Sequence, residues 1–265
     1  MKRILTIAGS DSGGGAGIQA DLKTITLLGG FGMSALTALT AQNTVAVEAI
    51  HEIPLDFIEA QIDAVFSDIG VDAVKTGMLS NAGVVQLVAD KLAQHKPPIV
   101  VVDPVMVAKS GDPLLADDAR ETLAGSLLPL ATLVTPNLPE ASALIGWEVG
   151  GEEDMQTAAE EIYRLGPKYV LVKGGHLQGE PVDLLFDGEH FHEFRSERVD
   201  TKNVHGTGCT YASAIATYLA QELDVVAAVA AAKRFITGAI RHGLSLGRGH
   251  GPTNPYAVVS QDWKR

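Results

Sequence analysis

The sequence predicts an α/β domain in which helices cover both faces of a central, mostly parallel sheet. Short apolar runs rich in Val, Ile and Thr alternate with longer segments of helical period along most of the 265 residues. Parallel strands have this continuous apolar character because helices bury both of their faces. No Pro/Ser-rich linker, low-complexity tract or internal repeat interrupts the pattern, so we expect a single domain over residues 1–265.

The individual elements follow from this alternation in chain order. Apolar, β-branched runs predict strands over 4–8, 35–40, 73–76, 99–102, 133–135 and 169–173. Segments of 3.6-residue period predict helices over 18–28, 84–92, 117–128, 138–145, 155–165, 210–223 and 225–242. One segment departs from this order, because Asp187-Gly188 stands between two short strand-like runs. It predicts an antiparallel hairpin over 182–194 that extends one edge of the sheet.

The charge balance excludes several functional classes. Lys and Arg number 20 and Asp and Glu 32, so the formal charge is −12. This charge argues against a nucleic-acid binder or a membrane-surface protein, because both partners are polyanions. The apolar run 225–232 is also far shorter than the roughly 20 residues of a membrane-spanning helix. Cys209 is the only cysteine, which excludes an intrachain disulfide and predicts a cytoplasmic protein.

The segments that follow the strands are unusually polar and rich in glycine. Open α/β sheets bind ligands outside the carboxyl ends of their strands, so these segments are expected to meet at one rim. They are 9–15, 40–43, 75–78, 103–106, 135–137 and 173–176.

Neither common nucleotide-binding fingerprint is present. Gly9 and Gly14 have the spacing of a Walker A loop, but Gly15-Ala16 stand where Lys and Ser or Thr are required. The dinucleotide fingerprint needs a third Gly or Ala, and Ile18 and Tyr211 occupy the two possible positions. A nicotinamide-dependent oxidoreductase is therefore disfavoured.

A second glycine cluster, Gly206-Thr207-Gly208-Cys209, precedes a long helix rich in Ala and Ile. Glycines there allow consecutive backbone N–H groups to turn inward, and the helix dipole adds positive potential. The cluster therefore predicts an anion hole suited to a phosphoryl group in transit. The same field would favour the thiolate of Cys209, although a lone cysteine is also commonly a small buried apolar residue.

Two further positions have both a structural and a functional interpretation. Asn137 and Glu140 have the spacing of a capping box at a helix start, but Glu140 could equally act on Mg²⁺ through water. Lys173 ends a buried strand, where its ammonium needs an anionic partner. A phosphate group of a bound ligand would provide this negative charge.

Taken together, these motifs resemble the hydroxymethylpyrimidine/phosphomethylpyrimidine kinases of thiamine biosynthesis. The matching segments are 7–23, 40–44, 102–106, 109–115, 135–140 and 205–210, within a match that runs in order from residue 4 to about 252. The resemblance implies a ribokinase-like three-layer α/β/α sandwich, shared with pyridoxal kinases. It also implies that ATP, with Mg²⁺, phosphorylates the pyrimidine substrate twice.

The resemblance places the substrate at Gly9, Gln42, Met78 and Val105. The carboxamide of Gln42 can donate one hydrogen bond and accept another, which matches the adjacent ring nitrogen and exocyclic amine of an aminopyrimidine. A pyridine alcohol lacks that amine, but pyridoxine or pyridoxal kinase activity stays open as the alternative. Gln42 could instead cap strand-end backbone, and Met78 and Val105, with Met106, could be ordinary core residues.

The resemblance assigns the remaining roles by position. Cys209 replaces the aspartate base of most ribokinase relatives and lies with Gly206, Thr207 and Gly208 in the anion hole, and Asp21 lies near the substrate hydroxymethyl. The other implied positions are Lys109, Asn137, Lys173 and Lys233 for ATP, and Asp103 and Glu140 for the metal.

The loop 109–115 resembles one that closes over the reactants, although an ordinary surface loop with a polar turn would look similar. The resemblance also implies a homodimer. A non-catalytic pyrimidine-binding regulator is disfavoured, because a sensor needs no cradle for a γ-phosphate.

Overall fold

A computed structural model describes residues 1–108, 111, 114–116, 118–175, 177 and 179–263. Across this part of the chain, nine strands form one sheet in the order β3-β2-β1-β4-β5-β6-β7-β8-β9. The strands are β1 (Arg3–Asp11), β2 (Phe31–Gln42), β3 (Val47–Glu52), β4 (Ala73–Thr76), β5 (Val100–Val102), β6 (Leu133–Val134), β7 (Tyr169–Lys173), β8 (Val182–Phe186) and β9 (Phe191–Arg195).

The sheet is parallel from β2 through β7 and antiparallel at both edges. The predicted edge hairpin is confirmed, because β8 pairs antiparallel with β7 and with β9. The second antiparallel edge, β3, was not predicted. Its six residues are exposed or half-buried and include Glu48, His51 and Glu52, so it has no continuous apolar run. Edge strands of this kind lack the pattern that identifies buried strands.

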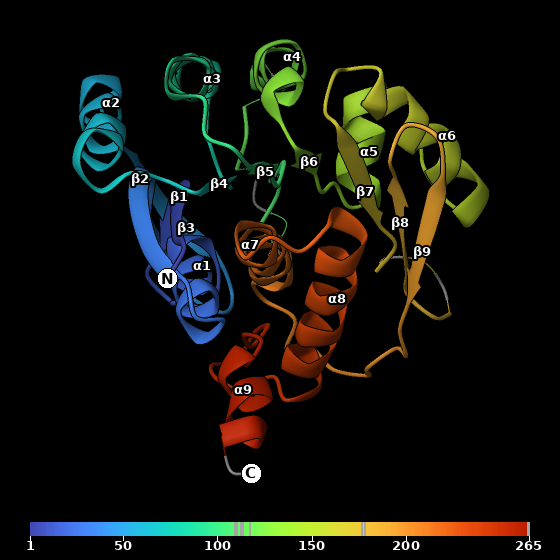
Figure 1. Cartoon of the computed structure of the whole chain (residues 1–265). Coiled ribbons are helices and arrows are strands. Elements are labelled where there is room, and N and C mark those ends of the chain that lie inside the picture. The colour runs from blue at the N-terminus through green and yellow to red at the C-terminus, as the bar shows by residue number, and fades with distance from the viewer. Residues whose placement is uncertain (109–110, 112–113, 117, 176, 178, 264–265) are drawn as a thin grey trace.

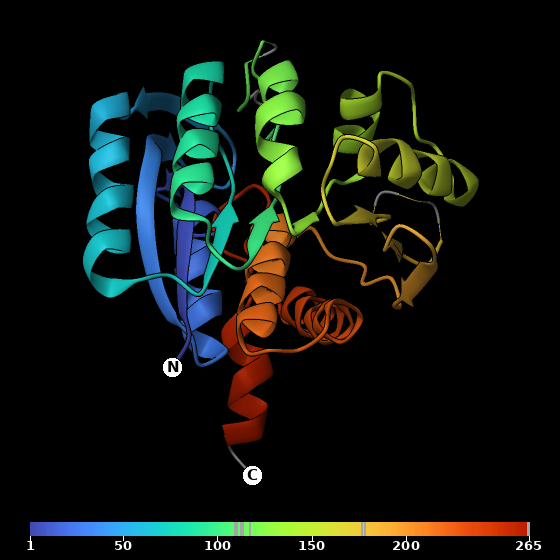
Figure 2. The same cartoon turned by 45° about the horizontal axis from the view of Figure 1, so that its top comes forward.

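Helices cover both faces of the sheet (Figures 1 and 2). One face carries α1 (Gly17–Leu27), α7 (Thr207–Ala220) and α8 (Val225–Arg241), with α9 (Pro255–Trp263) packed on α1 and α8. The other face carries α2 (Leu55–Ala64), α3 (Ala82–His95), α4 (Ala119–Thr122), α5 (Leu138–Ile145) and α6 (Glu152–Tyr163). The predicted three layers are therefore present. Among the described residues, no helix combines the length and apolar character needed to cross a membrane.

Two helices, α2 and α9, were not predicted, and the helix expected over 117–128 takes a different form. After α4 the chain widens into a π turn at Leu123–Leu127 and then tightens into a 3-10 turn at Leu128–Leu130. Pro129 lies at the start of the 3-10 turn and has no backbone N–H to continue an α-helical ladder. Residue 117 lies outside the described residues.

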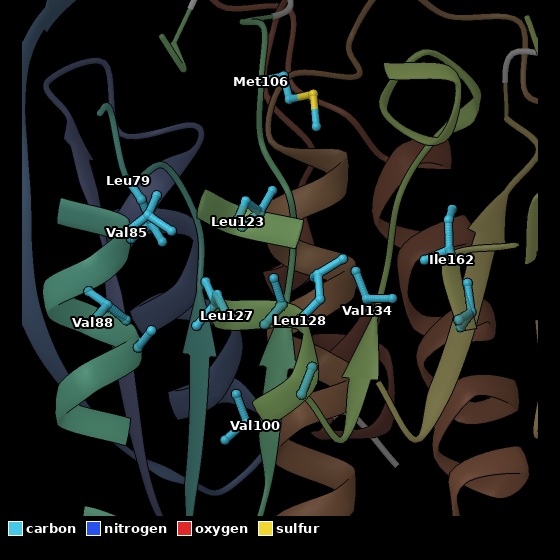
Figure 3. Close-up of a cluster of buried hydrophobic side chains, with 14 of the residues drawn as sticks. Leu79, Val85, Val88, Val100, Met106, Leu123, Leu127, Leu128, Val134 and Ile162 are labelled. Atoms are coloured by element: carbon cyan, nitrogen blue, oxygen red, sulfur yellow. The ribbon is translucent and has the colours of Figure 1, made fainter. Parts of the chain in front are cut away.

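Two hydrophobic cores lie on opposite faces of the sheet. Val100 and Val102 of β5 point into one core, and Val101 between them points into the other. The first core includes Val88 of α3 and Ile162 of α6 (Figure 3). The second is built from α1, α7 and α8. Both faces of the central strands are thus buried, which explains their continuous apolar sequence.

Candidate functional site

A cavity of about 950 Å³ lies at the carboxyl ends of the parallel strands. Residues at or just after the ends of six strands line it: Asp11, Gln42, Gly77, Asp103, Asn137 and Lys173. The predicted rim is therefore present as a hollow. Gly206, Thr207, Gly208 and Cys209, at the start of α7, line the same cavity. The cavity thus joins the glycine-rich strand ends to the N-terminus of a long helix.

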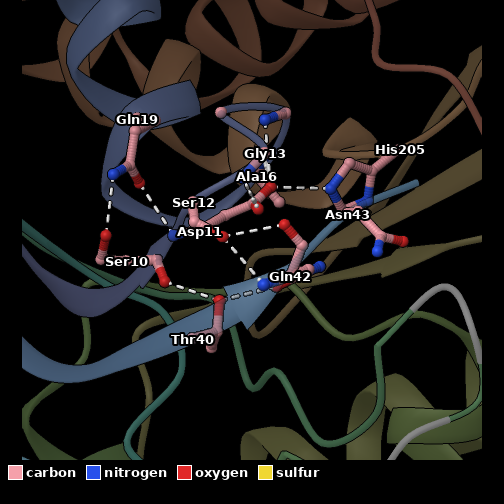
Figure 4. Close-up of polar contacts among 12 residues, drawn as sticks. Ser10, Asp11, Ser12, Gly13, Ala16, Gln19, Thr40, Gln42, Asn43 and His205 are labelled. Atoms are coloured by element: carbon pink, nitrogen blue, oxygen red, sulfur yellow. Dashed lines mark hydrogen bonds and ion pairs between the residues drawn. The ribbon is translucent and has the colours of Figure 1, made fainter. Parts of the chain in front are cut away.

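Asp11 ties the two glycine-rich loops together (Figure 4). Its carboxylate accepts hydrogen bonds from the backbone N–H groups of Gly13, Gly15 and Ala16 at 2.8 to 3.0 Å. His205, next to the second glycine cluster, lies with its Nε2 at 2.8 Å from Asp11 Oδ2. Burial raises the pKa of Asp11, but the hydrogen bonds from His205 and the backbone outweigh this and hold the pKa below its ordinary value. The carboxylate thus fixes both loops.

Gln42 stands where β2 leaves the sheet, with its backbone clamped by Ser12. The Gln42 N–H donates to Ser12 Oγ, and Ser12 Oγ donates to the Gln42 carbonyl, both at 2.8 Å. The Thr40 hydroxyl lies 3.0 Å from the side-chain oxygen of Gln42 (Figure 4). These contacts hold the carboxamide at the cavity wall. They also leave its NH₂ group available for a ligand.

The second glycine cluster forms the first turn of α7. Gly206 is the N-cap residue with φ +78°, and no side chain caps the helix. A Cβ on Gly206 would lie only 1.8 Å from the Gly15 carbonyl oxygen, so the two glycine loops approach as closely as their backbones allow. The N–H groups of a first helical turn have no intrahelical acceptor. The Thr207 N–H donates to the Val204 carbonyl at 3.2 Å, so the neighbouring glycine N–H groups are the ones available to an anion.

Cys209 lines the cavity within this turn. Burial raises the pKa of its thiol to about 11, and the positive charge of Lys75 only partly opposes the rise. The helix start therefore does not produce the thiolate that sequence considerations favoured. At neutral pH Cys209 is a thiol.

Lys173 and two carboxylates form a buried charged group between β5, β7 and α5. Lys173 Nζ lies 2.8 Å from Asp103 Oδ1 and 4.0 Å from Glu140 Oε2. The anionic partner expected for Lys173 is therefore provided by the protein itself. Thr135 Oγ1 also donates to Asp103, at 3.1 Å. Burial raises the pKa of Glu140 to about 7, with the charge of Lys173 opposing the rise.

The two interpretations of Asn137 and Glu140 prove compatible. Asn137 Oδ1 accepts the Glu140 N–H at 2.9 Å and Glu140 Oε2 accepts the Asn137 N–H at 2.8 Å, which completes a capping box. Both residues also line the cavity.

Asp103 and Glu140 suit a magnesium ion held mainly by water and phosphate oxygens, because Mg²⁺ uses few protein carboxylates. Burial is the main cause of the raised Glu140 pKa, and the smaller contribution from repulsion by Asp103 would be relieved by a divalent cation. No group of three or more His, Cys, Asp or Glu side chains suited to a metal occurs in the described residues.

Lys233 reaches the cavity from α8. Its Nζ lies 2.6 Å from Asp183 Oδ2, and Asp183 Oδ1 accepts the Gly174 N–H at 3.1 Å. Asp183 thus joins α8 to the turn after β7. Sequence reasoning did not identify Asp183, although an acidic residue inside the apolar run Val182–Phe186 was a usable signal.

The remaining predicted positions divide into three groups. Gly9, Met78 and Val105 line the cavity, as do Gly111, Leu114 and Leu115 of the expected closing loop. Asp21 is fully buried and is not among the cavity-lining residues, and it pairs with Lys75, which does line the cavity. The sequence placed Lys75 in the rim segment 75–78 but gave it no role. Lys109 lies outside the described residues.

Comparisons with known proteins agree with this geometry. The family model for phosphomethylpyrimidine kinase matches residues 11–254. The thiamine biosynthesis bifunctional protein ThiED of Geobacter sulfurreducens is 60% identical over 260 residues, which are 98% of this chain and 53% of that protein. The chain thus spans about half of its length. The hydroxymethylpyrimidine/phosphomethylpyrimidine kinase of Streptomyces coelicolor is 53% identical over 251 residues, 95% of this chain and 93% of the relative.

The fold is shared with a vitamin kinase of known structure. The ADP complex of Bacillus subtilis pyridoxal kinase superposes with a TM-score of 0.91 and is 43% identical, covering 97% of this chain and 98% of the other. This likeness confirms the predicted ribokinase-like fold. The family match covers most of the chain, and the chain therefore belongs to the phosphomethylpyrimidine kinase family, a family of phosphotransferases.

Proposed function

We propose that the chain transfers the γ-phosphoryl group of ATP, with Mg²⁺, to 4-amino-5-hydroxymethyl-2-methylpyrimidine and then to its monophosphate, giving the diphosphate used in thiamine biosynthesis. One observation carries this proposal: a single cavity is lined both by the carboxamide of Gln42, which suits an aminopyrimidine, and by the glycine-rich start of α7, which suits an anion. Lys173 and the two carboxylates beside it add the charges that a nucleotide triphosphate and its metal require.

The proposed roles follow from the cavity wall. Gln42 pairs with the ring nitrogen and exocyclic amine of the pyrimidine, while Gly9, Met78 and Val105 form the surrounding wall. Mg²⁺ bound through water at Asp103 and Glu140 would neutralise charge on the phosphates.

ATP is proposed to lie against Asn137, Lys173 and Lys233, which line the cavity. Lys109 is assigned to ATP by the family resemblance alone.

The chemical step is a transfer between two oxygens. The acceptor oxygen forms a bond to the γ-phosphorus as the bond to the bridging oxygen breaks, and that electron pair leaves with ADP. Backbone N–H groups of Gly206 and Gly208 would stabilise the negative charge in transit, and Thr207, whose N–H donates to the Val204 carbonyl, shapes the turn between them. The raised pKa of Cys209 favours a role in shaping this anion hole over that of a resting base. Full retention of rate in Cys209→Ala would exclude the base role.

The deciding experiment measures ADP release with the pyrimidine alcohol, with its monophosphate and with pyridoxal, side by side. We expect turnover of both pyrimidines. No turnover of either at high enzyme concentration would overturn the proposal.

Pyridoxal kinase activity is the second candidate, favoured by the close superposition on the Bacillus subtilis enzyme. A higher kcat/KM for pyridoxal than for the pyrimidine alcohol would make it the main activity.

We further infer a homodimer formed through the β3 edge. Exposed apolar side chains gather on β2, β3, α2 and the connections between them: Leu39, Val45, Ile50, Leu55 and Phe57. β3 also has an unpaired edge available to a second copy of the chain. Light scattering should give twice the chain mass, and Ile50→Lys combined with Phe57→Lys should halve it. A monomeric mass for the unaltered chain would contradict the inference.

Two broader expectations are also proposals. A single kinase domain over residues 1–265 is supported by the one continuous sheet, whose strands come from residues 3 to 195 and whose second face is covered by α7 and α8. Cytoplasmic location is supported by the single, unpaired Cys209. Limited proteolysis tests the first, because two domains would yield two stable fragments. Cell fractionation tests the second.

A further inference from the structure

Lys75 is a fully buried lysine that also lines the cavity. It lies in β4, between Val74 and Thr76, and its ammonium pairs with the buried Asp21 of α1. Nζ lies 3.0 Å from Asp21 Oδ1 and 2.9 Å from Asp21 Oδ2. The family resemblance places Asp21 near the substrate hydroxymethyl, but no role described above uses Lys75. A buried charge of this kind is costly unless it is well paired or has a function.

The acceptors of Asp21 are all used, whereas the donors of Lys75 are not. Asp21 also accepts from Ser213 at 2.7 Å and from Thr6 at 2.6 Å, so both of its oxygens are fully engaged. A lysine ammonium has three N–H donors. Lys75 directs its hydrogen bonds only to Asp21 among the residues that the structure describes, so at least one donor has no protein acceptor.

The position of Nζ shows where that donor can act. A Cβ built on Gly77 would lie 2.9 Å from Lys75 Nζ and 3.0 Å from Ala8 Cβ, and both Gly77 and Ala8 line the cavity. The ammonium therefore lies beside Gly77, in the space that a side chain at this position would enter. A glycine at this position is what lets the charge approach the cavity.

The positive charge of Lys75 also acts on Cys209, which lies in the proposed anion hole. The Lys75 ammonium and the Cys209 sulfur are close enough for each to influence the protonation of the other. Burial lowers the pKa of Lys75, but the charge of Asp21 raises it further, so the amine stays protonated. The floor of the cavity beside the anion hole thus carries a protonated amine that the Asp21 carboxylate holds in place.

We propose that Lys75 is a catalytic residue, whose free N–H donates to the acceptor oxygen of the substrate, and that Asp21 is a positioning residue that holds it there. This inference rests on the proposed function. The acceptor is an alcohol oxygen in the first phosphorylation and a phosphate oxygen in the second. Both oxygens can accept a hydrogen bond from an ammonium, so Lys75 can serve both steps. As the acceptor oxygen bonds to the γ-phosphorus and ADP leaves with the bridging electron pair, Lys75 stabilises the negative charge between them. The alcohol proton passes late to a phosphoryl oxygen, and Lys75 keeps its own proton.

The test removes both charges together, so that neither is left unpaired. In the double variant Lys75→Met/Asp21→Asn, the amide side chain can still bond to Thr6 and Ser213. We expect a folded protein whose kcat falls by about 10²-fold or more, the range found when one oxyanion donor is removed, with KM for ATP nearly unchanged. A folded double variant with kcat within about threefold of the unaltered chain would reduce the pair to a structural ion pair and overturn the proposal.

Lys91 provides the matched control. It is also a buried lysine, 4% exposed, and pairs with Asp63 and Glu59 on the face that carries α2 and α3, away from the cavity. Lys91→Met should lower the melting temperature and leave kcat unchanged. An equal loss of kcat in Lys91→Met and in the double variant would show that lost stability explains both, and would overturn the proposal.

Two further observations separate the possible failures. If the unaltered chain phosphorylates neither pyrimidine, the proposed function fails before Lys75 is tested. If the double variant does not fold, a crystal structure of the unaltered chain with the pyrimidine alcohol and a non-hydrolysable ATP analogue decides the matter. We expect Lys75 Nζ within about 3.2 Å of the hydroxymethyl oxygen. A distance beyond about 4.5 Å, with no bridging water, would overturn the proposal.

Discussion

Replacing Asp11 with Asn should destabilise the chain by about 3–5 kcal/mol at pH 7, because hydrogen bonds to a buried carboxylate are lost. Asp11 is 2% exposed and receives three backbone N–H groups and His205. An asparagine retains one acceptor oxygen for Gly13. Its NH₂ group, however, would face the N–H groups of Gly15 and Ala16 and the ring of His205. Hydrogen bonds to a charged group contribute about 1.5–3 kcal/mol each, so the estimate corresponds to about two of them.

The pH dependence follows from the direction of the pKa shift. Because the folded pKa of Asp11 lies below its unfolded value, its contribution to stability is present above about pH 4 and is lost as the pH falls through the folded pKa. Urea unfolding of the unaltered chain and of Asp11→Asn, at pH 7 and at pH 3, measures this directly. The difference in the free energy of unfolding should shrink at the lower pH.

An exposed aspartate supplies the control for this comparison. Asp68 is exposed and lies after α2, remote from the cavity wall, so Asp68→Asn should change stability by less than about 0.5 kcal/mol. A loss below 1 kcal/mol for Asp11→Asn at pH 7, or a loss that does not depend on pH, would refute the role of Asp11 in joining the two glycine loops.

Four further outcomes follow from the site. Alkylation of Cys209 by iodoacetamide at pH 8 should be at least about 100-fold slower than that of free cysteine and should rise about tenfold per pH unit; an apparent pKa below 8.5 would contradict its raised value. Gln42→Ala should raise KM for the pyrimidine by about 10–100-fold and leave KM for ATP unchanged, whereas an equal loss of both would refute its role. Lys173→Met leaves two buried carboxylates unpaired and should cost about 3–5 kcal/mol in urea unfolding, so an unchanged midpoint would exclude the buried charge group. Gly206→Ala should not give a folded, active protein, because its Cβ has no room; normal activity and melting would show that the loops are further apart.

Much of the fold could be predicted because its buried strands carry a strong pattern. Val100, Val101 and Val102 are all buried, and such runs can be recognised without knowing their neighbours. The antiparallel hairpin was equally accessible from Asp187-Gly188. β3 could not be found in this way, because Glu48, His51 and Glu52 make it polar, and its pairing with β2 is a tertiary contact.

For the candidate site, the positions of residues at the rim could be predicted, but the pairing of their side chains could not. Strand-end positions such as Gln42 and Asp103 could be assigned to the rim because parallel strands deliver their carboxyl ends to one edge. The resemblance also assigned Asp103 and Glu140 to one metal site, but nothing in the sequence showed that Lys173 pairs with them. Lys75 was placed in the rim segment 75–78 but was given no role, although the argument applied to Lys173 holds for it too: a lysine inside a buried strand needs an anion. That anion, Asp21, comes from α1, 54 residues away in the chain.

The double phosphorylation proposed for this one cavity can be followed directly. ³¹P nuclear magnetic resonance of the chain with the pyrimidine alcohol, ATP and Mg²⁺ follows every phosphorus-containing species in one experiment. We predict that a monophosphate ester appears first and is converted into a diphosphate, while ADP accumulates in step with both. Release of inorganic phosphate from ATP without either pyrimidine ester would contradict it.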